Sequence, residues 1–183
     1  TVKTINRVLS IHTSGQKEVT VDMGQPVFSP GEIPFLADSA SKTYTRFIPL
    51  NGHKTNVEFC ALSMGNPHVV IIVEDLDKTA VKDIGEALGK HIDFPEGVNV
   101  GFAQIISRSE INVRVHERGA GETLACGTGA CAAMVAGCLL GTLDDVVKVN
   151  LKGGYLTVKW KGQASPVLMT GPVCTVYEGV IEL

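Results

Sequence analysis

The hydrophobic positions in the first part of the chain predict a series of β-strands. Residues 18–23 alternate between apolar and polar side chains, which is typical of a half-buried strand. Residues 8–13 precede them across a turn signal, Ser14-Gly15-Gln16. Prolines and a glycine break the pattern over residues 24–34, where we place a boundary or a crossing segment. Further strands are predicted at 43–48, 56–63 and 68–73.

The predicted strand at 68–73 is followed by an amphipathic helix. The strand is continuously apolar, so both of its faces should be buried. The helix is predicted over residues 79–90, and Thr79 or Asp77 is suited to cap its start. One face carries the apolar side chains of Val81, Ile84 and Leu88. The other carries the charged side chains of Lys82, Asp83 and Glu86.

A second helix, predicted over residues 128–140, is apolar on all sides. A helix without a polar face must be enclosed by protein. At 1.5 Å per residue it is roughly 20 Å long, so it fits the middle of a small barrel or a curved sheet. Gly141 is well placed to end it.

The remaining hydrophobic runs predict strands and settle the class. These strands lie at 98–106, 110–116, 146–151, 155–160, 166–169, 173–177 and 179–183. Many antiparallel strands around one buried helix make an α+β fold, a sheet or barrel-like half wrapped on a central helix.

Composition narrows the class of protein. The chain has 183 residues, 44% of them hydrophobic, with a net charge of −3 and no long basic run, which disfavours nucleic-acid binding. The longest strongly apolar stretch, 130–140, is too short to span a bilayer, and the N-terminus carries no signal-peptide pattern. The five cysteines include no Cys-x-x-Cys pair, so we expect reduced thiols in a cytoplasmic protein, without a disulfide framework or a metal site.

The segment most suited to chemistry is the glycine-rich loop at 117–130, which leads into the apolar helix. Cys126 lies at or just before the helix N-terminus, where unpaired amides and the helix dipole favour negative charge. We therefore expect a lowered thiol pKa and a partly ionised sulfur. Gly127 and Gly129 leave backbone amides accessible to a carboxylate. The alternative is an inert buried thiol, which is the favoured interpretation for the other four cysteines.

Two polar positions next to predicted strands are weaker candidates. Asn66 and His68 flank Pro67 in a turn, and they either bind a substrate and assist proton transfer or form only structural hydrogen bonds. Asn99 lies within a β-run and must find partners if it is buried.

With these segments in hand, the chain resembles the diaminopimelate epimerase family along essentially its whole length. The block Glu117-Arg118-Gly119-Ala120-Gly121-Glu122-Thr123, followed by Ala125-Cys126-Gly127-Thr128-Gly129-Ala130, is the most specific match. Other matching stretches are Gly65-Asn66-Pro67-His68, 94–102, Gly153-Gly154-x-Leu156 and Met169-Thr170-Gly171-Pro172.

The resemblance implies a fold, a reaction and a set of site residues. The family has two similar halves, each a curved sheet around a helix, and interconverts LL- and meso-diaminopimelate for lysine and cell-wall synthesis without a cofactor or metal. Each half contributes one cysteine to an acid/base pair. By resemblance, the catalytic residues are Cys126, Glu117 and His68, and the substrate-binding residues are Asn66, Asn99, Arg118, Gly127 and Thr128.

The chain departs from the family at one point. Residues 1–125 contain no second Cys-Gly-x-Gly-Ala segment. On the family pattern, residues 27–173 are a C-terminal half-domain, whereas 1–26 and 174–183 are remnants of the N-terminal half. Inversion of a carbon needs an acid and a base on opposite faces, so we expect that a truncated chain of this kind does not epimerise alone.

Two other functions remain open. A proline or hydroxyproline racemase of related chemistry is disfavoured, because Arg118, Asn66 and Asn99 suit a substrate with a second charged end. A non-catalytic binding half-protein is the other alternative. Apolar surface left bare by a missing half would favour self-association or a homodimer.

Overall fold

The computed structural model describes residues 1–3, 8–14, 17–50 and 52–181. The turn signal predicted at residues 15–16 and the strand end predicted at 182–183 lie outside these residues. The elements are β1 (Val2–Lys3), β2 (Val8–Leu9), β3 (Ile11–Ser14), β4 (Glu18–Asp22), the 3-10 helix η1 (Pro30–Glu32), β5 (Tyr44–Leu50), β6 (His53–Ser63), β7 (Pro67–Val73), α1 (Val81–Gly89), β8 (Asn99–Ser107), β9 (Glu110–Glu117), β10 (Gly121–Thr123), α2 (Gly127–Leu139), β11 (Val146–Leu151), β12 (Gly154–Lys159) and β13 (Leu168–Pro172).

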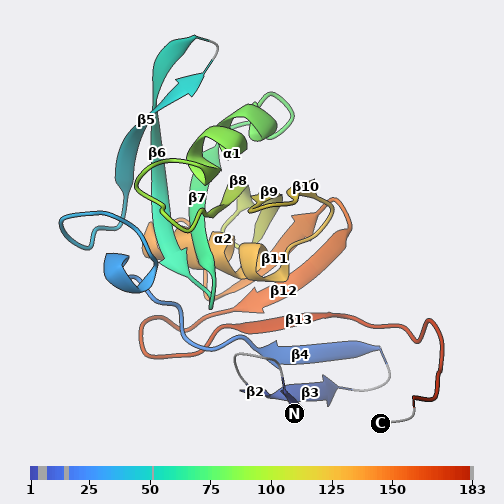
Figure 1. Ribbon diagram of the computed structural model, residues 1–183. Helices are drawn as coiled ribbons and strands as arrows, with labels where there is room; N and C mark the ends of the chain where they lie inside the picture. The colour runs from blue at the N-terminus through green and yellow to red at the C-terminus, as the bar shows by residue number, and fades with distance from the viewer. Residues whose placement is uncertain (4–7, 15–16, 51, 182–183) are drawn as a thin grey trace.

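One large sheet organises the fold and confirms the α+β class. Eleven strands join in the order β3-β4-β13-β12-β11-β9-β8-β7-β6-β5, with β10 paired to β9 off this path. Most neighbours are antiparallel, as predicted, but β7 and β8 run parallel, as do β9 and β11. Figure 1 shows β12, β13, β4 and β3 stacked below α2, while β5 and β6 extend away from it at the top.

Helix α2 is enclosed by this sheet, as its uniformly apolar sequence predicts. Every residue from Gly129 to Gly137 is buried. The helix packs against inward-facing side chains of β8, β9, β11 and β12, including Ala103, Val113 and Val149. It ends one residue earlier than predicted, with Gly141 at a φ of 76° just beyond the last turn.

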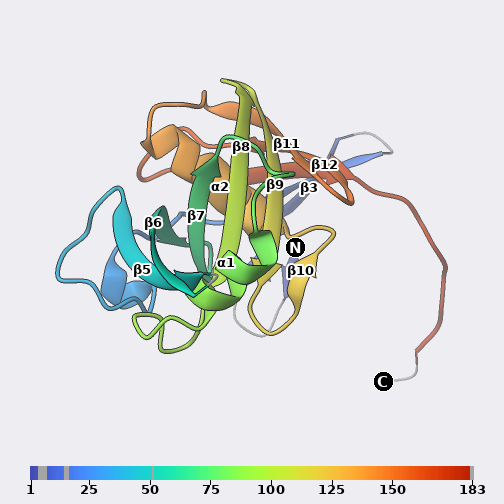
Figure 2. The same cartoon turned by 90° about the horizontal axis from the view of Figure 1, so that it is seen from above.

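Helix α1 covers the opposite face of the sheet, so the central strands are buried on both sides (Figure 2). In β7, Val70 packs in the α2 core while Val69 and Ile71 pack in the second core beneath α1. Successive side chains of a strand point to opposite faces, which explains the continuous apolar run. Only the end of the strand departs from the prediction, since Ile72 is 37% exposed.

The predicted cap of α1 is wrong. The N-cap residue is Ala80, which offers no side-chain hydrogen bond. The hydroxyl of Thr79 donates instead to the backbone oxygen of Asp75 at 2.6 Å, and the side chain of Asp75 accepts the amide of Asp77 at 2.9 Å. These contacts close a turn before the helix, and the N-cap position falls on Ala80, after both predicted residues.

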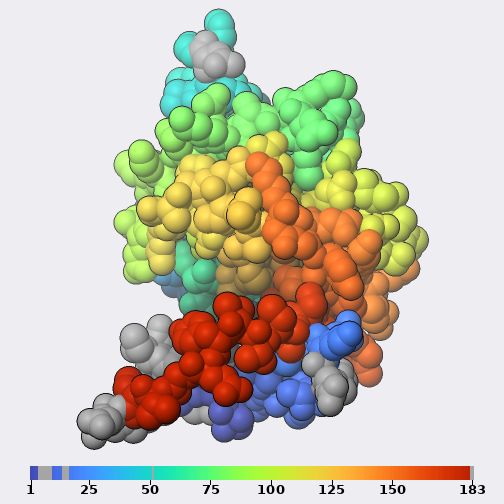
Figure 3. Space-filling model, turned by 90° about the vertical axis from the view of Figure 1, so that its right-hand side faces the viewer, coloured from blue at the N-terminus to red at the C-terminus, as the bar shows by residue number. Residues whose placement is uncertain are grey.

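The strands predicted after residue 172 are wrong over 173–181. This segment forms no strand among the described residues, and in Figure 2 it runs away from the sheet. In Figure 3 it lies on the outside of the molecule, coloured red. Its apolar side chains are exposed, with Tyr177 at 83% and Val180 at 101%. High β propensity does not form a strand when no neighbouring strand is available to pair with it.

Candidate active site

The β9–β10 hairpin brings Glu117 next to Cys126, nine residues further along the chain. Glu117 ends β9, and the turn to β10 has positive φ angles at Gly119 and Gly121, 80° and 78°, which favour glycine. β10 pairs antiparallel with β9, with Gly121 opposite Glu117. The segment predicted as a plain loop is therefore a hairpin that returns the chain to the start of α2.

Cys126 occupies the N-cap position of α2, as predicted. Its backbone is extended, with φ −138° and ψ 106°, and the residue is only 6% exposed. The sulfur forms no capping hydrogen bond. Its Sγ donates instead to Glu117 Oε2 at 3.3 Å and lies 3.6 Å from Thr128 Oγ1. The thiol is thus paired with a carboxylate at the N-terminus of a buried helix.

The predicted lowering of the Cys126 pKa is wrong. Burial raises the pKa of this thiol above its ordinary value, and Glu117 raises it further through its hydrogen bond and its negative charge. The hydroxyl of Thr128 and the amide of Gly129 favour the thiolate but do not outweigh burial. The side chain therefore rests as a neutral thiol with its proton directed at a carboxylate.

Asn66 and His68 reach the same place from the start of β7. The side-chain amide of Asn66 donates to Thr128 Oγ1 at 3.4 Å, and its Oδ1 lies 3.0 Å from His68 Nε2. His68 is fully buried, and this burial, with a smaller effect from Arg118, lowers its pKa to about 4. The imidazole is therefore neutral near pH 7, and its Nδ1 has no hydrogen-bond partner within the part of the chain that is described.

Asn99 and Arg118 hold the adjoining loops together. Asn99 is 4% exposed; its Nδ2 donates to the Pro67 oxygen at 3.1 Å, and its Oδ1 accepts the Arg118 amide at 3.0 Å. Arg118 is exposed, and its guanidinium donates to the backbone oxygen of Glu96 at 2.7 Å. Arg118 directly follows Glu117 in the chain, and Gly127 follows Cys126. With these neighbours and the hydrogen bonds above, the eight residues predicted from the sequence lie in one connected group.

Two residues next to this group were given no functional role by the sequence analysis. Thr123, in β10, donates from Oγ1 to Glu117 Oε1 at 2.5 Å. Met169, in β13, lies against Gly127, where its Sδ would be 3.1 Å from a Cβ atom added to the glycine. The hairpin register could have indicated Thr123, whereas Met169 comes from a strand that only the tertiary fold brings close.

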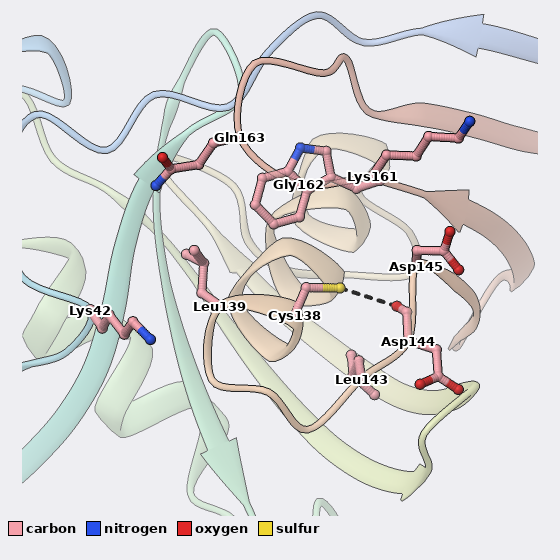
Figure 4. A pocket seen from close by; sticks show the side chains of 10 residues that line it. Lys42, Cys138, Leu139, Leu143, Asp144, Asp145, Lys161, Gly162 and Gln163 are labelled. Carbon is pink, nitrogen blue, oxygen red and sulfur yellow. Dashed lines mark hydrogen bonds between the residues drawn. The ribbon is translucent and has the colours of Figure 1, made fainter.

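A pocket of about 440 Å³ lies at the opposite end of α2 and is separate from this group. Figure 4 shows Cys138 there, with Sγ donating to the Asp144 backbone oxygen at 3.1 Å. Burial, aided by Asp145 and Asp144, raises the pKa of Cys138 to about 11. Across the described ranges, His, Cys, Asp and Glu form no cluster arranged to hold a metal ion. Within those same ranges, no helix combines the length and apolar character needed to cross a membrane.

Comparison with known proteins identifies the family of the chain. The sequence model of the family described as diaminopimelate epimerase matches residues 60–176, which include every residue of the connected group. The chain belongs to the diaminopimelate epimerase family. The resemblance drawn from the cysteine loop is thereby confirmed.

Relatives in this family extend well beyond the chain. A diaminopimelate epimerase from Chromobacterium violaceum is 48% identical over 182 residues, covering 100% of this chain and 64% of that protein. One from Nitrosomonas europaea is 51% identical over 166 residues, covering 91% of this chain and 59% of that protein. The chain thus spans about three fifths of the length of these two curated relatives.

Solved structures of more distant proteins share the fold. A hydroxyproline epimerase from Agrobacterium vitis has a TM-score of 0.59 at 16% identity, covering 89% of this chain and 53% of that one. A phenazine biosynthesis protein of the PhzF family from Bacillus anthracis has a TM-score of 0.52 at 15% identity, covering 88% and 60%. At these identities the likeness shows the fold alone.

Proposed function

We propose that this chain forms the C-terminal catalytic half of a cofactor-independent isomerase that interconverts LL- and meso-diaminopimelate. The observation that carries the proposal is the contact between Cys126 Sγ and Glu117 Oε2, 3.3 Å, at the N-terminus of the buried helix α2. Because relatives about 50% identical are diaminopimelate epimerases, the same substrate is the natural choice for this site. A cytoplasmic location fits five cysteines that are all free thiols.

In this proposal Cys126 transfers the α-proton on one face of the substrate. As a thiol it delivers its proton to the α-carbon; in the reverse direction the S–H proton passes to Glu117, and the thiolate removes the α-proton. A pKa raised by burial and by Glu117 suits the acid role. The developing negative charge lies near the amides of Gly127 and Thr128, the first residues of α2, which stabilise it without a cofactor.

The other predicted residues hold the substrate in the proposed site. Arg118 is exposed, and its guanidinium suits the distal carboxylate, while Asn66 is half-buried beside Thr128. Asn99 already has two partners, which leaves one N–H and one lone pair for the substrate. The unpartnered Nδ1 of the buried His68 is suited to a proton-transfer partner on the other side of the substrate.

That partner is proposed to lie in the part of the relatives' length that this chain does not span. We propose that residues 27–173 form the C-terminal half-domain and that 1–26 and 174–183 belong with the N-terminal half. In support, the buried core residues of the described chain, apart from Met23, all lie between Ile33 and Val167. The exposed apolar segment at 173–181 would then be covered in the whole protein. In the isolated chain it would favour self-association. A measurement of the molecular mass in solution tests this.

The test compares the isolated chain with a chimera. In the chimera, this chain replaces the matched stretch of the Chromobacterium violaceum relative. We expect the chimera to interconvert LL- and meso-diaminopimelate and the isolated 183-residue chain to give no measurable turnover, because inversion needs groups on both faces. Turnover by the isolated chain at the rate of the chimera would refute the requirement for a second half. A folded chimera without turnover would refute the proposed activity.

A further inference from the structure

The β9–β10 hairpin places Thr123, whose side chain carries a hydroxyl, on the same face as Glu117. Gly121 pairs with Glu117 and Thr123 pairs with Val115, so the side chains of Glu117 and Thr123 are diagonal neighbours on one face. That face is the one on which Val115 packs in the α2 core. The hairpin register alone therefore directs the Thr123 hydroxyl toward the carboxylate beside Cys126.

Each oxygen of the Glu117 carboxylate has its own donor. Thr123 Oγ1 donates to Oε1 at 2.5 Å, and Cys126 Sγ donates to Oε2 at 3.3 Å. A carboxylate with one oxygen free can rotate about its terminal bond, whereas two donors on opposite oxygens fix its plane. With Oε1 occupied by the threonine, Oε2 is the oxygen directed at the sulfur.

We propose that Thr123 is a positioning residue that fixes the Glu117 carboxylate against the Cys126 thiol. The inference rests on the proposed function for its role in catalysis: it keeps Glu117 in place to receive the S–H proton and to return it. In the described structure the Thr123 hydroxyl bonds to Glu117 and not to the sulfur, whose partners are Glu117 and Thr128, so Thr123 acts through Glu117. Within the described structure, Glu117 is the charged side chain whose negative charge raises the pKa of Cys126.

The hairpin itself does not depend on this hydroxyl. On its opposite face, Arg114 forms a two-point ion pair with Glu122, with distances of 2.7 and 2.9 Å. Hydrogen bonding from Arg114 lowers the pKa of Glu122 to about 2, and Lys152 contacts the same carboxylate at 2.7 Å. Removal of the Thr123 hydroxyl should therefore leave β10 paired with β9, which separates a positioning role from a structural one.

The test measures the rate of Cys126 alkylation by iodoacetamide against pH in the 183-residue chain, resolved by peptide mass spectrometry. Glu117→Gln removes the negative charge beside the sulfur, so the thiol pKa should fall and alkylation at about pH 8 should become about threefold faster or more. Thr123→Val frees the carboxylate to turn away and should shift the profile in the same direction. Thr123→Ser restores a hydroxyl and should restore the wild-type profile.

The double variant decides whether Thr123 acts through Glu117. Thr123→Val should add no further change in the Glu117→Gln background, because the group it positions is already neutral. The matched control is Thr170→Val. The hydroxyl of Thr170, in β13, lies 2.8 Å from the hydroxyl of Thr20, in β4. Its removal should leave the pH profile of Cys126 alkylation unchanged. If Thr123→Val does not unfold cooperatively, Thr123→Ala takes its place.

Two outcomes would overturn the inference. One is an unchanged or slower alkylation of Cys126 in the Thr123→Val variant. The other is a shift from Thr123→Val that is equally large in the wild-type and Glu117→Gln backgrounds. The readout needs no turnover, so it is independent of the proposed activity. Coupling between Thr123 and Glu117 in a chain whose chimera does not epimerise would refute the function and leave the positioning role standing.

Discussion

Cys126→Ala in the chimera is expected to lower the rate of diaminopimelate interconversion by about 10²–10⁴-fold. Cys126 is only 6% exposed, and alanine keeps the Cβ atom of its side chain, so the site should keep its shape. It removes the group that exchanges a proton with the α-carbon, together with the donor to Glu117 Oε2. The initial rate of meso-diaminopimelate formation from the LL-isomer measures the effect.

Cys138→Ala is the matched control for this loss. Cys138 lies one residue before the end of the same helix, is half-buried, and donates to the Asp144 backbone oxygen away from the candidate site. Its removal should change the rate by much less than tenfold. Equal losses in the two variants would mean that the effect of Cys126→Ala is structural and not catalytic.

Ala132→Asp is expected to prevent folding of the chain. Ala132 is fully buried in α2, and the core around it is built from apolar side chains. Burial of a carboxyl group without a partner costs on the order of several kcal/mol, which is comparable with the whole stability of a domain, about 5–15 kcal/mol. Loss of a cooperative unfolding transition, followed by circular dichroism, measures the outcome.

The same substitution at Ala80 is the control, with the opposite sign. Ala80 is exposed and lies at the N-cap of α1, where no side chain caps the helix. An aspartate at an N-cap stabilises by about 0.5–2 kcal/mol relative to alanine. If Ala80→Asp and Ala132→Asp had similar effects, the burial of α2 inside the sheet would be contradicted.

The elements that the sequence predicts best are those whose environment is encoded in local periodicity. The eleven apolar residues at 130–140 have no polar face, a pattern that by itself requires enclosure, and α2 lies within one residue of its predicted bounds. The alternation at 110–116 likewise identifies the inward-facing side of β9. In both cases a single element carries the whole signal.

The features that could not be predicted depend on partners distant in the sequence. The apolar alternation at 173–181 resembles a strand, but a strand requires a neighbour, and the described chain offers none there. The prediction for the Cys126 pKa rests on the helix terminus alone, whereas burial and Glu117, delivered by the hairpin, decide its direction. The hydrogen bond between Asn66 and Thr128 joins residues 62 positions apart and leaves no local signal.

The most direct test of the central claim is protection of Cys126 by substrate. In the isolated chain, alkylation of Cys126 should slow as meso-diaminopimelate is added, while the exposed Cys174 should react at an unchanged rate. L-Lysine, which lacks the second carboxylate offered to Arg118, should protect less. If Cys126 reacts equally fast with and without diaminopimelate, the sulfur at the start of α2 does not face the substrate and the account is contradicted.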